Sequence, residues 1–227
     1  MGRANTRLAV LIELERPDVV ALQEWPGNQP LPAPLPEGWH VVRDQGLVIA
    51  SRLPIVESET LKSPVNPMQT LGVRCELLTV DGPVYFYGLH LRTPRMGLEA
   101  VLAHWWDGLA DLEEVTAQRN LDGAAVREWL QKRVGQVVVA GDLNLTPDSA
   151  IYKRQFGHLQ NAHAAAGWGW GATKVTRFHR ARIDHILANV HLQIIRCDVC
   201  PDVGSDHRPL VADLRLLRNQ PSPIHSP

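Results

Sequence analysis

The stretch that decides the fold is residues 137–144, VVVAGDLN. Its first four residues are apolar and mostly β-branched, which predicts a strand buried on both faces of a sheet. A glycine and then Asp142 and Asn144 follow at the end where this strand would leave the core. The stretch therefore predicts a carboxylate and an amide presented at the rim of a buried sheet.

Further apolar runs extend this pattern along the chain. Strands are expected at residues 19–22, 39–42, 46–51, 55–61, 71–80, 84–91, 183–187, 192–199 and 210–216. The turn Asp81-Gly82 between two of them is typical of a β-hairpin, which excludes a purely parallel alternation of strands and helices. A first helix is expected from Asn5 or Thr6 to Pro17, and a helical pattern covers residues 97–133, where Gly123 could divide it in two.

These elements predict an α/β fold. We expect a four-layer sandwich in which two mainly antiparallel or mixed β-sheets pack face to face with helices outside. A chain of 227 residues fits one large domain, expected over residues 1–218. Residues 219–227 are rich in proline and serine and are expected to form a disordered tail.

Composition narrows the class of protein. A formal net charge of −1 argues against a broadly basic surface for nucleic acid, although a local groove needs only a few cations. Three cysteines give no disulfide framework, and we interpret Cys197 and Cys200 as strand residues rather than zinc ligands. No stretch approaches the ~20 apolar residues of a membrane span. As written, the chain is expected in the cytoplasm; a segment upstream would allow export or membrane anchoring.

Polar side chains recur where the apolar runs end. The set comprises Glu24, His90, Asp142, Asn144, Asp184, Asp206 and His207. Each residue alone has an ordinary explanation as a loop acid, a turn former or a core histidine. Strand ends can converge on one rim, however, and four carboxylates gathered there would repel one another and bind a hard cation such as Mg²⁺.

The same residues resemble, in chain order, the motifs of the endonuclease/exonuclease/phosphatase superfamily. The matching segments are residues 17–24 (PDVVALQE), 46–54 (GLVIASRLP), 88–91 (GLHL), 141–144 (GDLN), 182–186 (RIDHI) and 205–209 (SDHRP). A lone GDLN would be a weak signal, whereas six segments in the right order are specific. The resemblance covers nearly the whole chain.

The resemblance implies a DNase I-like sandwich, a divalent metal and phosphoester hydrolysis. It makes Glu24 the metal ligand and places Asp206 beside the metal, while Asp142 would polarise the attacking water. A cation suits this chemistry because it offsets the charge that develops on the phosphoryl oxygens. The expected cofactor is Mg²⁺ or Mn²⁺.

The remaining motif residues are assigned to catalysis and to the substrate. Asn144 and His90 would bind the phosphate. Asp184 would hydrogen-bond His207 and orient it, and His207 would act as a general base or hold phosphoryl oxygens. Arg182 is a further candidate phosphate contact.

Two glycine-spaced aromatic residues, Trp168 and Trp170 in the segment GWGWG, are candidate substrate-binding residues. In a loop near Asp184 they could stack on a base or a sugar. The alternative is that the two indoles pack onto the sandwich.

Two departures from the motifs bear on function. Members of the superfamily open with a central strand that ends in an asparagine beside the metal, whereas Asn5 stands so close to the first helix that we interpret it as a cap. We therefore expect an N-terminally short domain with an open strand edge, weak metal binding and slow turnover. An upstream strand ending in Asn would restore metal binding and turnover.

Leu53 replaces a glutamate that supports the phosphate-site histidine in DNase I-like members, which counts against a close relative of DNase I.

The sequence thus predicts a divalent-metal-dependent phosphoester hydrolase, in the first place a phosphodiesterase or nuclease. Its partner is expected to be a phosphoester substrate, which could be nucleic acid. A phosphomonoesterase or phospholipase acting on a small or lipid substrate is the second reading. A catalytically impaired fragment or binding domain is the third, suggested by the absent asparagine strand. The intact set of motif carboxylates and histidines favours an enzyme.

Overall fold

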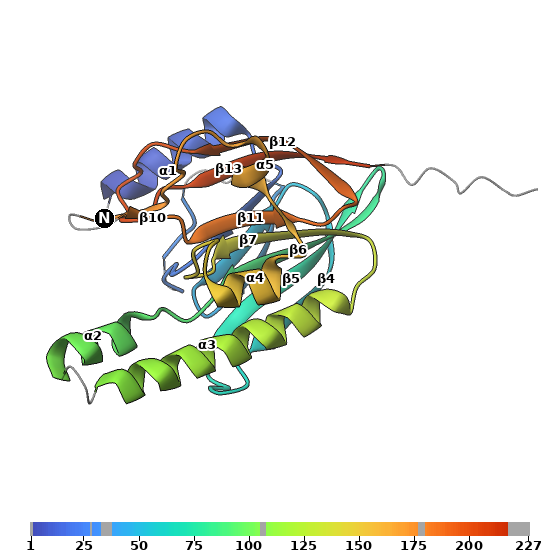
Figure 1. Cartoon of the computed structure of the whole chain (residues 1–227). Coiled ribbons are helices and arrows are strands. Elements are labelled where there is room, and N and C mark those ends of the chain that lie inside the picture. The colour runs from blue at the N-terminus through green and yellow to red at the C-terminus, as the bar shows by residue number, and fades with distance from the viewer. Residues whose placement is uncertain (1, 28, 33–37, 105–107, 177–179, 218–227) are drawn as a thin grey trace, which may run out of the picture.

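The computed structural model describes residues 2–27, 29–32, 38–104, 108–176 and 180–217 (Figure 1). At its centre is a six-stranded mixed sheet. In spatial order its strands are β4 (Ile55–Lys62), β5 (Thr70–Thr79), β6 (Gly82–His90), β7 (Gln136–Asp142), β11 (Asp184–Ala188) and β8 (Gln160–Asn161). The expected tail at residues 219–227 lies outside the described residues.

Strand β7 is apolar on both sides because the large sheet is covered on both faces. Val137 and Val139 belong to one hydrophobic core, and Val138 and Ala140 contact the other. Successive side chains of a strand point to opposite faces, so an unbroken apolar run is what such a position requires. The predicted buried strand is confirmed.

Two small sheets form the second layer. One has the order β1 (Val19–Leu22), β3 (Leu47–Ser51), β2 (His40–Asp44), and the other pairs β12 (Leu192–Val199) with β13 (Leu210–Leu216). Leu47 and Ile49 of β3 and Leu192 of β12 share a core with Phe86 and Val138 of the large sheet. Both small sheets therefore pack on the same face of the large one.

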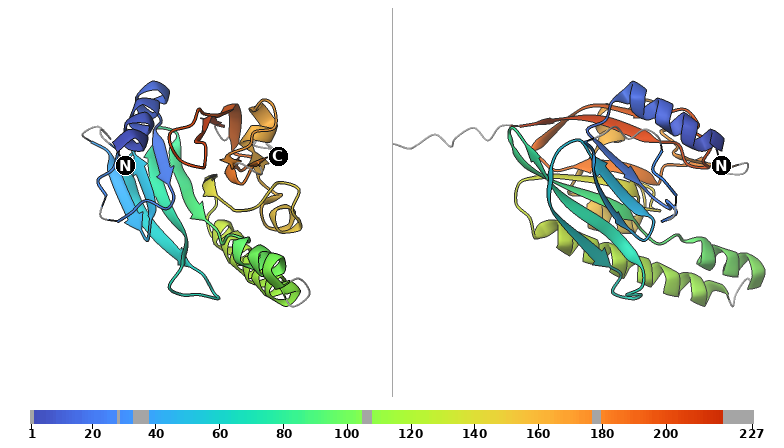
Figure 2. Two further views of the ribbon diagram at one scale, coloured as in Figure 1. Left: turned by 90° about the vertical axis from the view of Figure 1, so that its left-hand side faces the viewer. Right: turned by 180° about the vertical axis from the view of Figure 1, so that it is seen from behind.

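Helices form the two outer layers, and Figure 2 shows α1 and α3 on opposite sides of the sheets. The elements are α1 (Gly2–Glu15), α2 (Arg95–His104), α3 (Gly108–Gln131), α4 (Ala150–Phe156) and α5 (Ala162–Ala166). Trp129 of α3 and Phe156 of α4 are buried against the large sheet, while Glu15 of α1 forms an ion pair of 2.6 Å with Arg196 of β12. The predicted four-layer arrangement is confirmed. Among the described residues, every helix is too short or too polar to cross a membrane.

Some local expectations were wrong. Helix α3 continues through Gly123 and does not break there. The glycine instead lets α4 approach, because a Cβ at this position would lie only 3.1 Å from Gln155 Cγ. Helix α1 begins at Gly2, so Asn5 lies inside it and is not its cap. A hairpin of β9 (Lys174–Val175) and β10 (Arg180–Ala181) was not expected, because strands of two residues carry no periodicity.

The expected open strand edge is present. In the described part of the chain, β1 is the outer strand of its sheet, and its four residues are only partly buried. Among the described residues, strand β13 likewise pairs on one side only. Within this part of the chain, the second layer therefore consists of two sheets that are not paired with each other.

The glycine that precedes Asp142 is required by close backbone contact. Gly141 has a φ of +146°, and a Cβ there would lie 2.0 Å from the carbonyl oxygen of Leu89 on β6. We expect Gly141→Ala to lower the free energy of unfolding by about 2–4 kcal/mol, measured by urea denaturation. Gly27→Ala is the control, since a Cβ there meets nothing within 4 Å, and it should change stability by no more than about 1 kcal/mol. Equal effects would contradict the assigned contact.

Candidate active site

Three neighbouring strands of the large sheet each have one terminus at the same rim of the sheet. His90 closes β6, Asp142 closes β7, and Asp184 opens β11. In the pairing of the strands, Asp142 is the direct partner of His90 on one side and of Asp184 on the other. Hydrogen-bonded strands lie roughly 5 Å apart, so the register brings these three residues together.

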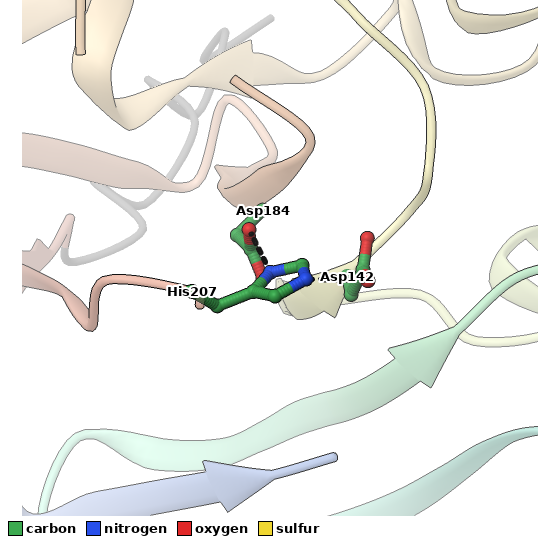
Figure 3. A group of neighbouring side chains, drawn as sticks. All are labelled: Asp142, Asp184 and His207. Carbon is green, nitrogen blue, oxygen red and sulfur yellow. Dashed lines mark hydrogen bonds and ion pairs between the residues drawn. The ribbon is translucent and has the colours of Figure 1, made fainter. Parts of the chain in front are cut away.

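His207, which precedes β13, completes a compact group with the two aspartates (Figure 3). Its Nδ1 lies 2.8 Å from Asp184 Oδ2, and its Nε2 lies 3.8 Å from Asp142 Oδ2. The three side chains offer ligand atoms that all lie within 4.8 Å of one another. The predicted contact between Asp184 and His207 is therefore confirmed.

Electrostatics distinguish the members of this group. Burial, followed by the charge of Asp184, raises the pKa of Asp142, and its hydrogen bond from the Asn144 amide does not cancel this. Burial lowers the pKa of His207, but the hydrogen bond and charge of Asp184 outweigh it, so the pKa lies above its usual value. A buried carboxylate that lacks full compensation thus faces an imidazole that favours its charged form.

Glu24 reaches the rim from the second layer. Its Oε1 lies 3.6 Å from His90 Nε2. Burial lowers the pKa of His90, while Glu24 opposes this and His207 adds to it. The pKa of His90 thus depends on the charges of both Glu24 and His207. His90 therefore lies between Glu24 and Asp142, and the prediction that all of these residues face one cleft stays a prediction.

Asn144 is held at the rim by the carboxylate two residues before it. Its backbone N–H donates to Asp142 Oδ1 at 2.8 Å, and its Nδ2 donates to the carbonyl oxygen of Leu91 at 2.8 Å. Asn144 has a φ of +50° and Glu24 a φ of +55°. Non-glycine residues adopt this left-handed conformation uncommonly, asparagine more readily than most, and Arg16 and Gln45 share it in this protein.

Asp206 was expected beside the metal, and in the structure its side chain contacts Lys174. Its carboxylate is exposed and forms an ion pair with Lys174 Nζ, and this hydrogen bond lowers the pKa of Asp206. Neither Asp206 nor Glu24 belongs to the group of three donors around His207. The residues assigned to the metal by resemblance therefore flank the donor group and do not form it.

Sequence reasoning missed two residues that support this region. Lys174 of β9 pairs with Asp206, and its charge acts on both Asp142 and His207. Thr173 is fully buried, and its Oγ1 accepts hydrogen bonds from the backbone of Ile183 and Asp184. Neither residue ends an apolar run, so the strand-end pattern gave no signal for them.

Arg182 and the two tryptophans are not members of the donor group. Arg182 Nη1 contacts His163 Nδ1 of α5, and its charge acts on His185 and Tyr152. Trp168 is 95% exposed and Trp170 is 82% exposed, so the alternative in which they pack on the sandwich is wrong. The role of all three residues in substrate binding stays a prediction.

The donor chemistry fits a hard divalent cation. His207 and Lys174 both act to lower the pKa of Asp142, yet it remains raised. More positive charge than the side chains supply is therefore needed to stabilise the ionised form. Carboxylate oxygens are the ligands that Mg²⁺ and Mn²⁺ prefer.

Fold and site together define a class: an α/β sandwich with carboxylates and histidines gathered at one rim of a buried sheet. The chain matches the endonuclease/exonuclease/phosphatase family over residues 2–207 and belongs to that family. Proteins of this family include phosphodiesterases, nucleases and phosphatases. No curated protein matches the chain.

Several solved structures share the fold. The endonuclease/exonuclease/phosphatase from Beutenbergia cavernae DSM 12333 is 22% identical with a TM-score of 0.66; the match covers 93% of this chain but only 66% of that protein. The mannosyl-6-phosphatase of Bacteroides thetaiotaomicron VPI-5482 is 17% identical with a TM-score of 0.70, over 95% and 91% of the two chains. D. rerio TDP2 with a single-strand DNA product is 16% identical with a TM-score of 0.69, over 95% and 93%.

The raised pKa of Asp142 makes a prediction about stability. An ionised Asp142 costs the folded protein free energy above its folded-state pKa, and this cost disappears as the pH falls towards its ordinary value of 3.8. In EDTA, Asp142→Asn should therefore raise the free energy of unfolding by about 1–3 kcal/mol at pH 8 and by less at pH 5.

Denaturant titrations at both pH values test this prediction, with Asp198→Asn on the exposed face of β12 as the control. The control should change stability by less than about 0.5 kcal/mol. Added Mg²⁺ should raise the free energy of unfolding more for the unmodified protein than for the Asp142→Asn variant. If Asp142→Asn raised the free energy of unfolding equally at pH 5 and pH 8, the charge of Asp142 would already be compensated in the folded protein.

Proposed function

We propose that this chain is a divalent-metal-dependent phosphoester hydrolase, acting as a phosphodiesterase or nuclease. The observation that carries the proposal is the 3.8 Å separation between His207 Nε2 and Asp142 Oδ2. This distance is too long for a direct hydrogen bond, but it suits a water or substrate oxygen that contacts both atoms. Membership of the family supports the same reaction class.

His207 has the environment of a proton carrier. Asp184 Oδ2 accepts from the Nδ1 side of the ring, which leaves Nε2 to accept a proton when the ring is neutral or to donate one when it is charged. The hydrogen bond and charge of Asp184 raise the pKa of His207 above its usual value, so they favour the charged ring that forms when His207 takes a proton. His207 therefore takes the proton of the attacking water or holds a phosphoryl oxygen through Nε2–H.

The proposed reaction is hydrolysis of one P–O ester bond. A water oxygen polarised by Asp142 forms a new bond to phosphorus, its proton passes to His207, and the ester oxygen leaves and takes up a proton. His90 would donate a hydrogen bond to the phosphate. Asn144 would donate one by giving up the longer of its two Nδ2 hydrogen bonds, which is 3.3 Å to Asp142 Oδ2 and not 2.8 Å to the carbonyl oxygen of Leu91. Glu24 would hold Mg²⁺ or Mn²⁺ with the carboxylates of the rim, and the cation would offset charge on the phosphoryl oxygens.

A substrate panel tests this function. Purified protein would be assayed with Mg²⁺ and with Mn²⁺ on DNA, RNA, abasic DNA, a phosphomonoester, a phosphoinositide and a generic phosphodiester. We expect a diester to be hydrolysed, and we expect His207→Ala and Asp184→Asn to lower kcat by roughly 10²–10⁴-fold.

The control for the panel is His40→Ala, an exposed histidine on β2, which should keep the full rate. Hydrolysis of only the monoester or the phosphoinositide would favour the phosphomonoesterase or phospholipase reading. Binding without turnover of any substrate, in either metal, would overturn the proposed enzyme in favour of a binding domain.

The exposed tryptophans predict that their removal affects the binding of a polynucleotide but not that of a small substrate. Base stacking on an aromatic side chain contributes about 1–3 kcal/mol per base. Trp168→Ala combined with Trp170→Ala should therefore raise KM for single-stranded DNA by at least about fivefold, while hydrolysis of a small generic diester is unchanged. Steady-state kinetics on both substrates measures this. A double variant with an unaltered KM for DNA would remove these residues from substrate binding.

A further inference from the structure

Helix α3 directs one arginine towards the two segments that carry His90 and Asn144. Arg119 donates from Nε to the carbonyl oxygen of Arg92 at 3.1 Å and from Nη2 to the carbonyl oxygen of Asn144 at 2.5 Å. Both acceptors lie two residues beyond a strand end, after His90 of β6 and after Asp142 of β7. One rigid, planar guanidinium thus spans both loops.

The two loops also bind each other, and Arg119 closes the arrangement from outside. The backbone N–H of Leu91 donates to the carbonyl oxygen of Asp142 at 2.9 Å. In return, Asn144 Nδ2 donates to the carbonyl oxygen of Leu91 at 2.8 Å. Asn144 has a left-handed backbone, which asparagine tolerates, and its side-chain bond to Leu91 holds this turn against the loop after His90.

A second residue on the same face of α3 reinforces this contact. Asp122 is fully buried one turn after Arg119, and its carboxylate accepts from Arg92 Nε at 3.3 Å and from Ser63 Oγ at 2.5 Å. Arg92 is therefore fixed through its backbone by Arg119 and through its side chain by Asp122. The segment that follows His90 is thus bonded to α3 at two points.

The bonds of Arg119 differ from those of a single surface contact because one guanidinium joins two separate loops. Burial lowers its pKa, and the acceptors of its guanidinium hydrogen bonds are neutral carbonyl oxygens. Helix α3 is anchored to the sheet by apolar residues further along, namely Val126, Trp129 and Leu130. A half-buried arginine thus bonds both the loop after His90 and the loop after Asp142 to the helix.

We propose that Arg119 is a positioning residue that holds His90 and Asn144 at the spacing needed to bind one phosphate; its catalytic consequence rests on the function proposed above. Methionine in its place keeps much of the apolar stem and removes both hydrogen bonds. Lysine keeps the charge but cannot reproduce the planar two-point contact.

The test compares Arg119→Met and Arg119→Lys with Arg127→Met. Arg127 lies on the same helix and also donates to a backbone carbonyl, that of Arg154 at 2.6 Å, but on the side facing α4. Assays run well below the melting temperature of every variant. We expect Arg119→Met to lower kcat by about 10–100-fold with little change in KM, Arg119→Lys to be intermediate, and Arg127→Met to keep the full rate.

Hydrogen exchange followed by mass spectrometry provides a readout that is independent of activity. In Arg119→Met, exchange should rise in peptides covering residues 88–95 and 140–148 and stay unchanged elsewhere, while Arg127→Met leaves both peptides protected. Unchanged exchange there, a uniform rise along the chain, or an unaltered kcat would overturn the positioning role. If the unmodified protein hydrolyses no phosphoester, the proposed function fails, and the exchange data alone still decide whether Arg119 holds the two loops.

Discussion

The site depends on the register of three neighbouring strands. Asp142 is the direct partner of His90 across one strand boundary and of Asp184 across the other. A slip of β11 by one residue would turn Asp184 to the opposite face of the sheet. His207 would then lose the carboxylate that orients it, and Asp142 would lose the neighbour that raises its pKa.

The buried core is what fixes this register. Alternate residues of β7 enter separate cores on the two faces of the sheet, so a slip would exchange the two sets and disturb both. The same burial withdraws Asp142 from water and makes its charge costly. Core packing and an unfavourable ionised carboxylate are therefore consequences of one arrangement, and a site of this kind gives up stability for chemistry.

Sequence alone predicted the parts of this molecule that have a strong local signal. Apolar runs of four or more residues gave the longer strands, and polar residues at their ends gave Asp142, Asp184 and His207, which the structure brings together. The short hairpin that carries Lys174 has no periodicity to read. The direction in which a side chain points could not be predicted from the sequence either, even where its strand or loop was, because it depends on partners that are distant in the chain. Asp206 turns to Lys174 and Arg182 to His163 for this reason.

Strand β1 has a consequence for the behaviour of the protein in solution. Its sequence, Val-Val-Ala-Leu, is uncharged and only partly buried, and in the described part of the chain it pairs on one side only. An apolar edge of this kind presents backbone groups that strands of other molecules can join. Asp18 and Glu24 flank it and act as charged gatekeepers against such pairing. Self-association at high concentration is therefore expected to begin at β1, and a cation that neutralises Glu24 would weaken one of the two charges that oppose it.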